Sequence, residues 1–259
     1  MTDSKLARRL AEIDALQTEI NSLRPLSKRA LAELRGYFRV GLTYSSNALE
    51  GNSLTESETK VVIEEGITIG GKPLKDHFEA VGHAEAFDLL YDLSLQADIA
   101  EEDIQALHRL FYFRIDAANA GTYRRVNVII TGTDFVPPGA AQVGPLMREF
   151  RAGLPGLRKK THPVEFAALI HLRLVTIHPF VDGNGRAARL LMNLALLQAG
   201  FSIAVIPPIV RSKYLDAIRK TEGPNAPPDV FVKFIADMVY ESQKDYRRLF
   251  NALASEGEC

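Results

Sequence analysis

The residues most able to do chemistry lie in one short stretch, HPFVDGNGRAAR, which runs from His178 to Arg189. It combines a histidine, which titrates near neutral pH, with a carboxylate, two glycines, an asparagine and two arginines. Pro179 disfavours a helical conformation for the residue before it, so a helix predicted over 163–177 is expected to stop at His178. A second helix is expected over 186–199. The stretch is therefore predicted to form a loop between two helices.

Binding of a polyvalent anion is the chemistry that this loop favours. The amides of a glycine-rich turn such as DGNG, at the start of a helix, bind anions with help from the positive end of the helix dipole. Arg186 and Arg189 add two positive charges there, where basic side chains are otherwise mildly unfavourable. Asp182 would repel a phosphate unless a Mg²⁺ ion lies between them. His178 is then placed to take a proton from an incoming hydroxyl.

Other interpretations of these residues fit less well. The stretch lacks the Lys-Ser/Thr ending of a P-loop, and no βαβ pattern surrounds it as a dinucleotide-binding motif requires. His171 and His178 share a helix face, but no further ligand at metal spacing joins them, so a zinc site is not expected. The remaining histidines are interpreted as structural or surface residues; they are His77, His83, His108 and His162.

The sequence resembles the Fic family. HPFVDGNGRAAR matches the family signature HPFx(D/E)GNGRxxR at every specified position, GTYRRVNVIITGTDFVPP resembles the family's flap hairpin, and RSKYLDAI resembles the helix that follows. The similar region covers about residues 45–240. This resemblance implies a mainly helical enzyme that moves AMP from ATP to a Ser, Thr or Tyr hydroxyl of a target protein and releases pyrophosphate.

The resemblance also implies roles for individual residues. His178 is expected to be the catalytic base, and Asp182 is expected to hold Mg²⁺ against the phosphates of ATP. The strand 128–131 is expected to flank the nucleotide and to pair with an extended segment of the target. The other nucleotide-binding positions implied are the amides of Gly183, Asn184 and Gly185, the side chains of Arg186 and Arg189, and Ile130, Thr131 and Tyr214.

A second motif implies regulation. SNALEG, which begins at Ser46, resembles the family's inhibitory motif (S/T)xxxE(G/N). Gly51 is a natural residue for ending a helix, and Glu50 then lies at the negative end of the helix dipole, where a carboxylate calls for a cationic partner. By the resemblance that partner is Arg189, and the pair would prevent a productive pose of ATP. In some relatives the same glutamate also supports removal of AMP from the target.

Two alternative functions stay open at this point. One is a transferase of another phosphate-bearing group, such as UMP, phosphocholine or a terminal phosphate. The other is a non-catalytic regulator that senses nucleotides.

The elements that must position these residues are predicted to be almost all helical. An all-α fold with one β-hairpin flap near 123–138 is expected, in a single domain over 1–259. Within it we expect an N-terminal helical hairpin (1–44), an inhibitory helix region (45–66) and a catalytic core (100–240). The apolar stripe of the N-terminal hairpin is predicted to pack on the body of the protein, although it also allows a homodimer. TESE at Thr55 predicts a capping box at a helix start.

Composition limits the remaining classes. The chain has 259 residues, 24% of them charged, and a formal net charge of -1, which does not favour a nucleic-acid partner. Its single cysteine, Cys259, excludes a disulfide framework within one chain. No apolar run reaches the length of a membrane span, so no membrane partner is expected. The sequence predicts a soluble, cytoplasmic protein whose small-molecule partners are ATP and Mg²⁺.

Overall fold

The computed structural model describes residues 4–221 and 226–255, and this part of the chain is helical without a β-strand. The lone cysteine lies outside it. The α-helices are α1 Ser4–Ser22, α2 Lys28–Leu49, α3 Glu56–Glu65, α4 Leu74–Leu93, α5 Glu101–Tyr112, α6 Ala140–Lys160, α7 Pro163–Ile177, α8 Asn184–Gln198, α9 Arg211–Arg219 and α10 Asp229–Ser255, and a 3₁₀ helix, η1, covers Pro208–Val210. The predicted mainly helical fold is confirmed.

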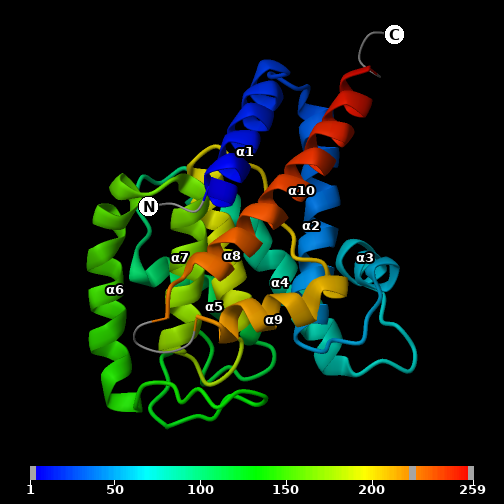
Figure 1. The fold of residues 1–259 in the computed structure, drawn as a ribbon. Helices are drawn as coiled ribbons and strands as arrows, with labels where there is room; N and C mark the ends of the chain where they lie inside the picture. Colours follow the sequence, from blue (N-terminus) through cyan, green and yellow to red (C-terminus); the bar gives the residue numbers. More distant parts are fainter. Residues whose placement is uncertain (1–3, 222–225, 256–259) are drawn as a thin grey trace.

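Helix α8 forms the centre of the molecule. From Asn184 to Leu196 every residue except Gly185 is buried, as expected for a helix that is covered on all sides. Helices α7, α4 and α5 pack directly around it, and α6 and α10 cover α7 from outside (Figure 1). The loop that carries the signature joins α7 to α8. The site therefore lies at the connection between the two helices that pack together most extensively.

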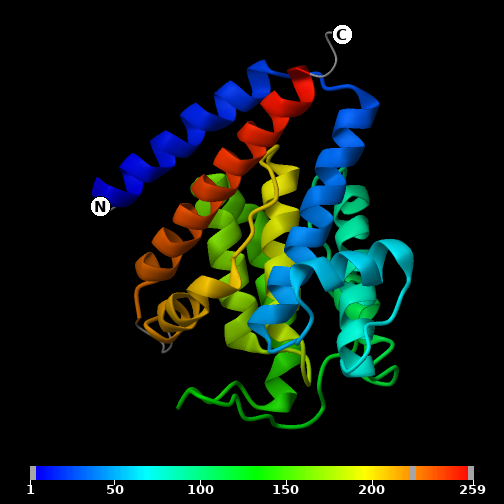
Figure 2. The ribbon, with the colours of Figure 1, turned by 90° about the vertical axis from the view of Figure 1, so that its right-hand side faces the viewer.

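The N-terminal hairpin packs on the body of the protein, as predicted. Figure 2 shows α1 and α10 running side by side along one flank. The apolar stripe of α1 is buried there; its members are Leu6, Leu10, Ile13, Leu16 and Ile20. Helix α2 runs without a break across residues 44 and 45, so the expected hairpin and the expected inhibitory region share one helix.

Local signals in the sequence placed several helix ends correctly. Thr55 and Glu58 form the predicted capping box, and Gly66 ends α3 in a left-handed conformation at φ +69°. The prediction for α7 coincides with the observed helix. In the described part of the chain, no helix combines the length and apolarity that spanning a bilayer needs.

The prediction of a β-hairpin at 123–138 is wrong. This segment is an irregular loop with a turn at Gly132, where φ is +84°. The Arg124 side chain binds one carbonyl near each end of the segment: Nη1 donates to Val126 O (3.0 Å) and Nη2 donates to Pro138 O (2.6 Å). Val126 and Ile129 stay exposed, whereas Val128 and Ile130 are partly buried, and in Figure 2 the loop lies along one end of the helices.

Candidate active site

His178 occupies a strained backbone position directly after α7. Its φ of 52° and ψ of 58° make it the one non-glycine residue with positive φ in the described chain. Such strain persists only where surrounding contacts fix it. Here the His178 amide donates to Leu174 O (2.9 Å), and Arg124 Nε donates to His178 O (2.7 Å). The next peptide is also fixed, because Arg124 N donates to Pro179 O (2.8 Å).

The imidazole of His178 is prepared to accept a proton. Its Nδ1 lies 3.3 Å from Val175 O; a carbonyl can only accept, so Nδ1 carries the hydrogen and Nε2 keeps its lone pair. Burial, the largest effect, lowers the pKa of His178, and the nearby Arg124 lowers it further, against the opposing influence of the Val175 hydrogen bond and of the Asp182 and Glu50 carboxylates. The ring is therefore neutral at neutral pH.

A second histidine supports the loop after His178. The ring of His108 stacks on Phe180, which is fully buried, with centroids 3.7 Å apart and planes 8° apart. His108 Nδ1 accepts from Gly121 N (2.9 Å), so Nε2 carries the hydrogen and donates to Asp182 O (3.0 Å). Burial lowers the pKa of His108 to about 4. The interpretation of His108 as a structural residue is confirmed, and its role is to hold the signature loop.

The glycine-rich turn is closed by its own asparagine. Asn184 Oδ1 accepts from Phe180 N (2.9 Å), and Asn184 Nδ2 donates to Phe180 O (3.0 Å). Gly183 has φ +79°, and a Cβ at this position would lie 2.6 Å from Cε2 of Phe111. Both the backbone conformation and the close packing therefore require glycine. These contacts fix the backbone at the start of α8, where the sequence predicts an anion site.

Arg186 is buried with a carboxylate that sequence reasoning did not identify. Its side chain is 2% exposed, and its Nη1 lies 2.7 Å from Oε1 of Glu79, which is 7% exposed. Asn52 Nδ2 holds the other oxygen of Glu79 at 2.9 Å. Arg186 Nε is buried and has no hydrogen-bond partner among the described residues. An unsatisfied buried donor of a charged group is costly, so this atom suits an anionic ligand.

Arg189 joins the two sequence motifs. Its Nε donates to Ser46 Oγ (2.9 Å), and its Nη2 donates to Ser46 O (2.9 Å) and to Glu50 Oε1 (2.7 Å). The remaining nitrogen, Nη1, donates to the hydroxyl of Tyr214 (3.2 Å). Arg189 is 2% exposed, whereas 38% of the Glu50 side chain is exposed. The structure therefore brings together two motifs that lie 139 residues apart.

The charge of Glu50 is stabilised by several arginines. Burial alone would raise the pKa of Glu50, but the attraction and hydrogen bond of Arg189, with smaller effects of Arg186 and Arg211, outweigh it and lower the pKa overall. Glu50 also lies close to Gly185, where the position of an added Cβ would clash with Oε1 of Glu50. The carboxylate of Glu50 thus approaches the start of α8 so closely that residue 185 has no room for a side chain.

A cavity of about 220 Å³ collects many of the predicted site residues. Its lining includes His178, Gly185, Glu50, Ile130, Thr131 and Tyr214, together with side chains from α7 and α9. The predicted residues Asp182, Gly183, Asn184, Arg186, Arg189 and Ser46 are absent from this lining. The base and the first turn of α8 therefore open onto a common space, whereas Arg186 and Arg189 are buried behind it.

Tyr214 is tied to a histidine that was given no place in the predicted site. Its hydroxyl lies 2.9 Å from His171 Nε2 and accepts a hydrogen bond from Arg189. Burial lowers the pKa of His171 well below its ordinary value, and Arg189 adds to this. A neutral imidazole can accept the tyrosine hydrogen, which turns the hydroxyl oxygen toward the guanidinium. No short motif in the sequence links His171 to Tyr214, which follows it by 43 residues.

Asp182 is the one predicted metal ligand. Its Oδ1 accepts from Gly183 N (2.6 Å), its Oδ2 lies 3.8 Å from Arg186 Nη2, and 52% of its side chain is exposed. The described residues contain no group of three or more His, Cys, Asp or Glu side chains that could hold a metal ion alone. A single open carboxylate beside an anion site suits a Mg²⁺ ion that shares its ligands with phosphates, because Mg²⁺ commonly takes one or two carboxylates.

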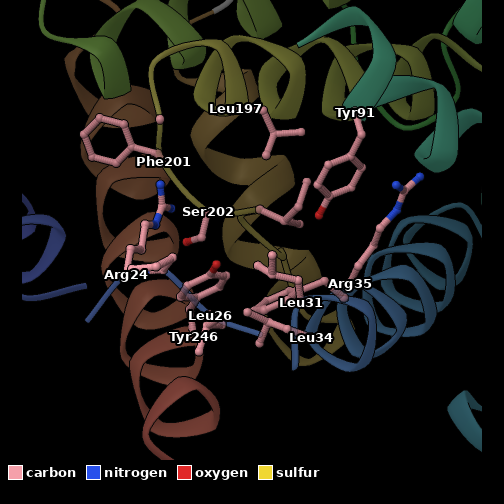
Figure 3. Close-up of a pocket in the computed structure, with 14 residues that line it drawn as sticks. Arg24, Leu26, Leu31, Leu34, Arg35, Tyr91, Leu197, Phe201, Ser202 and Tyr246 are labelled. Carbon is pink, nitrogen blue, oxygen red and sulfur yellow. The ribbon is translucent and has the colours of Figure 1, made fainter. Parts of the chain in front are cut away.

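A larger cavity, of about 550 Å³, lies elsewhere, between the α1–α2 turn, α2, α8 and α10 (Figure 3). Leucine and aromatic side chains line it, with Arg24 and Arg35 at its two sides. It contains no histidine and no carboxylate, so it lacks the groups that proton transfer or metal binding needs. The smaller cavity at His178 is the candidate active site.

Comparison with known proteins agrees with this geometry. A family model described as the Fic/DOC family matches residues 98–196. "Protein adenylyltransferase Fic" of Drosophila melanogaster is 37% identical over 234 residues, which are 89% of this chain and 46% of the relative. The chain thus spans less than half the length of that curated relative.

Solved structures share the fold. A Fic domain-containing signaling protein from Bacteroides thetaiotaomicron superposes with a TM-score of 0.85 at 28% identity, covering 93% of this chain and 97% of the other. Fic-1 from C. elegans superposes with a TM-score of 0.86 at 27% identity, covering 96% and 74%. With the complete signature at the α7–α8 turn and this shared fold, the chain belongs to the Fic/DOC family.

Proposed function

We propose that this protein transfers AMP from ATP to a Ser, Thr or Tyr hydroxyl of a target protein, and to itself. The observation that carries the proposal is the shared cavity, in which the neutral base His178 and the glycine-rich start of α8 face the same space. The similarity to relatives named protein adenylyltransferase supports the choice of AMP as the transferred group. ATP would enter from the side of Tyr214, Ile130 and Thr131.

The anion site accounts for the phosphates. The amides of Gly183, Asn184 and Gly185, at the positive end of α8, would bind phosphate oxygens; that of Gly183, which donates to Asp182 Oδ1, would exchange this bond for a phosphate. The unsatisfied Nε of Arg186 supplies a further donor. Arg189 would reach the outermost phosphate once Glu50 releases it. Mg²⁺ at Asp182 would neutralise part of the phosphate charge.

His178 would perform the proton transfer. As the target hydroxyl oxygen attacks the α-phosphorus, the bond to the pyrophosphate oxygen breaks, and the hydroxyl proton passes to Nε2 of His178. The hydrogen bond between Nδ1 and Val175 O keeps that lone pair available. The lowered pKa keeps the ring unprotonated at neutral pH.

The loop between α5 and α6 would hold the target. Ile129 is 94% exposed, and the adjacent Ile130 and Thr131 line the cavity. The backbone of this loop would accept a target segment by strand addition, which would place one target side chain over the cavity. Recognition would then depend on the backbone of the target more than on its sequence.

Glu50 and Ser46 would inhibit this reaction. Both hold Arg189, so the guanidinium is not available to a terminal phosphate while the end of α2 stays in place. Glu50 also occupies the space over Gly185. ATP can then bind only in a pose that is not productive for transfer.

A binding comparison tests the choice of nucleotide. Thermal shifts with ATP, UTP, GTP and CDP-choline, each with Mg²⁺, are measured for the wild type and for Glu50→Gly, followed by mass spectrometry of the modified hydroxyl. We expect ATP to give the largest shift and an adenylyl group to be found. A larger shift and transfer with UTP or CDP-choline would favour the other transferase. Binding without transfer in Glu50→Gly would favour the non-catalytic nucleotide sensor.

A further inference from the structure

The last four backbone carbonyls of α2 need hydrogen-bond donors from outside the helix. An α-helix leaves its last four C=O groups without intrahelical donors, and in α2 these belong to Ser46, Asn47, Ala48 and Leu49. Asn47 O accepts from the amides of residues 50 and 52, at 3.0 and 3.1 Å, and Ala48 O accepts from Gly51 N at 3.1 Å. The chain's own turn thus satisfies two of the four.

The other two carbonyls are satisfied by arginines of the catalytic core. Arg189 Nη2 donates to Ser46 O (2.9 Å), and Arg211 Nε donates to Leu49 O (2.7 Å). Arg211 is the first residue of α9, and α2 has no basic residue of its own in its last turn. The charge that complements the negative end of the α2 dipole therefore comes from α8 and α9.

The two arginines differ in what else they bind. Arg189 contacts Glu50, Ser46 and Tyr214 and, under the proposed function, must move from Glu50 to a phosphate. Arg211 makes its one hydrogen bond to Leu49 O, and no carboxylate lies within ion-pair distance of it in the described residues. This bond joins Arg211 to α2 directly and does not pass through Arg189. It can therefore keep the end of α2 in place while Arg189 exchanges partners.

We propose that Arg211 is a positioning residue for inhibition: by capping Leu49 O it holds the end of α2, and with it Glu50, against the catalytic core. This inference rests on the proposed function and names a part of its regulation. Loss of the cap should lower the free energy needed to displace the α2 end, so that the productive state becomes more populated. It should not create activity where Glu50 is already absent.

The test compares AMP transfer in five variants with the wild type. Arg211→Ala should raise the rate of self-modification about fivefold, the effect of losing one charged cap at a helix end. Arg211→Lys, which keeps a cation near Leu49 O, should show a smaller rise. Lys213→Ala is the matched control, because Lys213 is an exposed cation of α9 that does not line the cavity, and it has no hydrogen bond or ion pair to α2 among the described residues; it should show no rise. The double variant Glu50→Gly, Arg211→Ala should transfer AMP no faster than the single variant Glu50→Gly.

Hydrogen exchange supplies a readout that does not depend on activity. The amides of Glu50 and Gly51 should exchange faster in Arg211→Ala than in the wild type, whereas those of the capping box at Thr55 should not change. Unchanged exchange at both amides would overturn the proposal.

The kinetic outcomes separate this inference from the proposed function. If Glu50→Gly shows transfer and Arg211→Ala does not exceed the wild type, the capping role is wrong and the proposed function stands. If adding Arg211→Ala to Glu50→Gly lowers transfer severalfold, Arg211 serves the reaction itself and the capping role is again wrong. If Glu50→Gly shows no transfer with any nucleotide, the proposed function fails, and hydrogen exchange still tests the cap.

Discussion

His178 combines a strained backbone with a pKa suited to a base. The left-handed conformation is fixed by hydrogen bonds to both of its main-chain polar groups, from Arg124 and to Leu174. Burial lowers the pKa of the imidazole, which favours the neutral form that accepts a proton. Because the same loop holds the base and the anion site, the distance between them does not depend on the outer helices.

The pH dependence of transfer follows from the direction of that shift. A base works only when it is unprotonated, so kcat/KM of Glu50→Gly should fall toward acid through the pKa of His178. This pKa lies below the ordinary 6.5, and removal of Glu50, whose charge raises it, lowers it further. We therefore expect the midpoint of the acid limb below pH 6.5 in a kcat/KM profile. His178→Ala should lose transfer while retaining ATP binding by calorimetry; a midpoint above pH 6.5, or activity in His178→Ala, would contradict this role.

The pair of Glu79 and Arg186 gives a second prediction at the residue scale. Glu79→Gln leaves a buried guanidinium without its carboxylate, which costs about 3–5 kcal/mol and should lower the melting temperature on the order of 10 °C. Mg-ATP supplies replacement anions, so it should raise the melting temperature more in this variant than in the wild type. Glu85→Gln is the control, because Glu85 pairs with Arg114 at the surface and 38% of each side chain is exposed. Equal melting temperatures for Glu79→Gln and the wild type would contradict the account.

At the scale of elements, local signals predicted the helices well and the loop after α5 poorly. Periodicity and Pro179 gave the bounds of α7, and the capping box gave the start of α3, because these signals act within a few residues. The hairpin predicted at 123–138 is absent, and the segment is instead held by Arg124, whose side chain contacts the carbonyls of His178 and Pro138. The alternation of polar and apolar residues carries no information about tertiary contacts that compete with strand pairing. For the same reason Glu79 and His171 were missed, since their partners lie far along the chain.

Arg124 gives a prediction for this loop. Its buried guanidinium joins His178 O to two carbonyls of the segment 123–138. Arg124→Ala should loosen the segment, so that proteolysis within it becomes faster and kcat/KM for a protein target falls by at least tenfold. The neighbouring Arg125→Ala is the control, because Arg125 is exposed, and it should behave like the wild type. Unchanged proteolysis in Arg124→Ala would show that other contacts order the loop.

At the scale of the whole molecule, regulation depends on residues that are remote in sequence and adjacent in the fold. Helix α2 crosses the body from the α1–α2 turn to the start of α8, so its C-terminal end brings Ser46 and Glu50 to Arg189 (Figure 1). The family resemblance predicted this contact, whereas the residues themselves, through Gly51, could only place Glu50 at a helix end. The close fit of Glu50 over Gly185 makes the described state an inhibited one under the proposed function.

The rate of AMP transfer by Glu50→Gly, relative to the wild type, tests the central claim most directly. With labelled ATP and Mg²⁺, incorporation into the enzyme and into lysate proteins is measured as an initial rate. We expect Glu50→Gly to exceed the wild type by at least about tenfold, which corresponds to ~1.4 kcal/mol, and we expect Glu50→Gly with His178→Ala to show no incorporation. Equal rates for the wild type and Glu50→Gly would contradict the account.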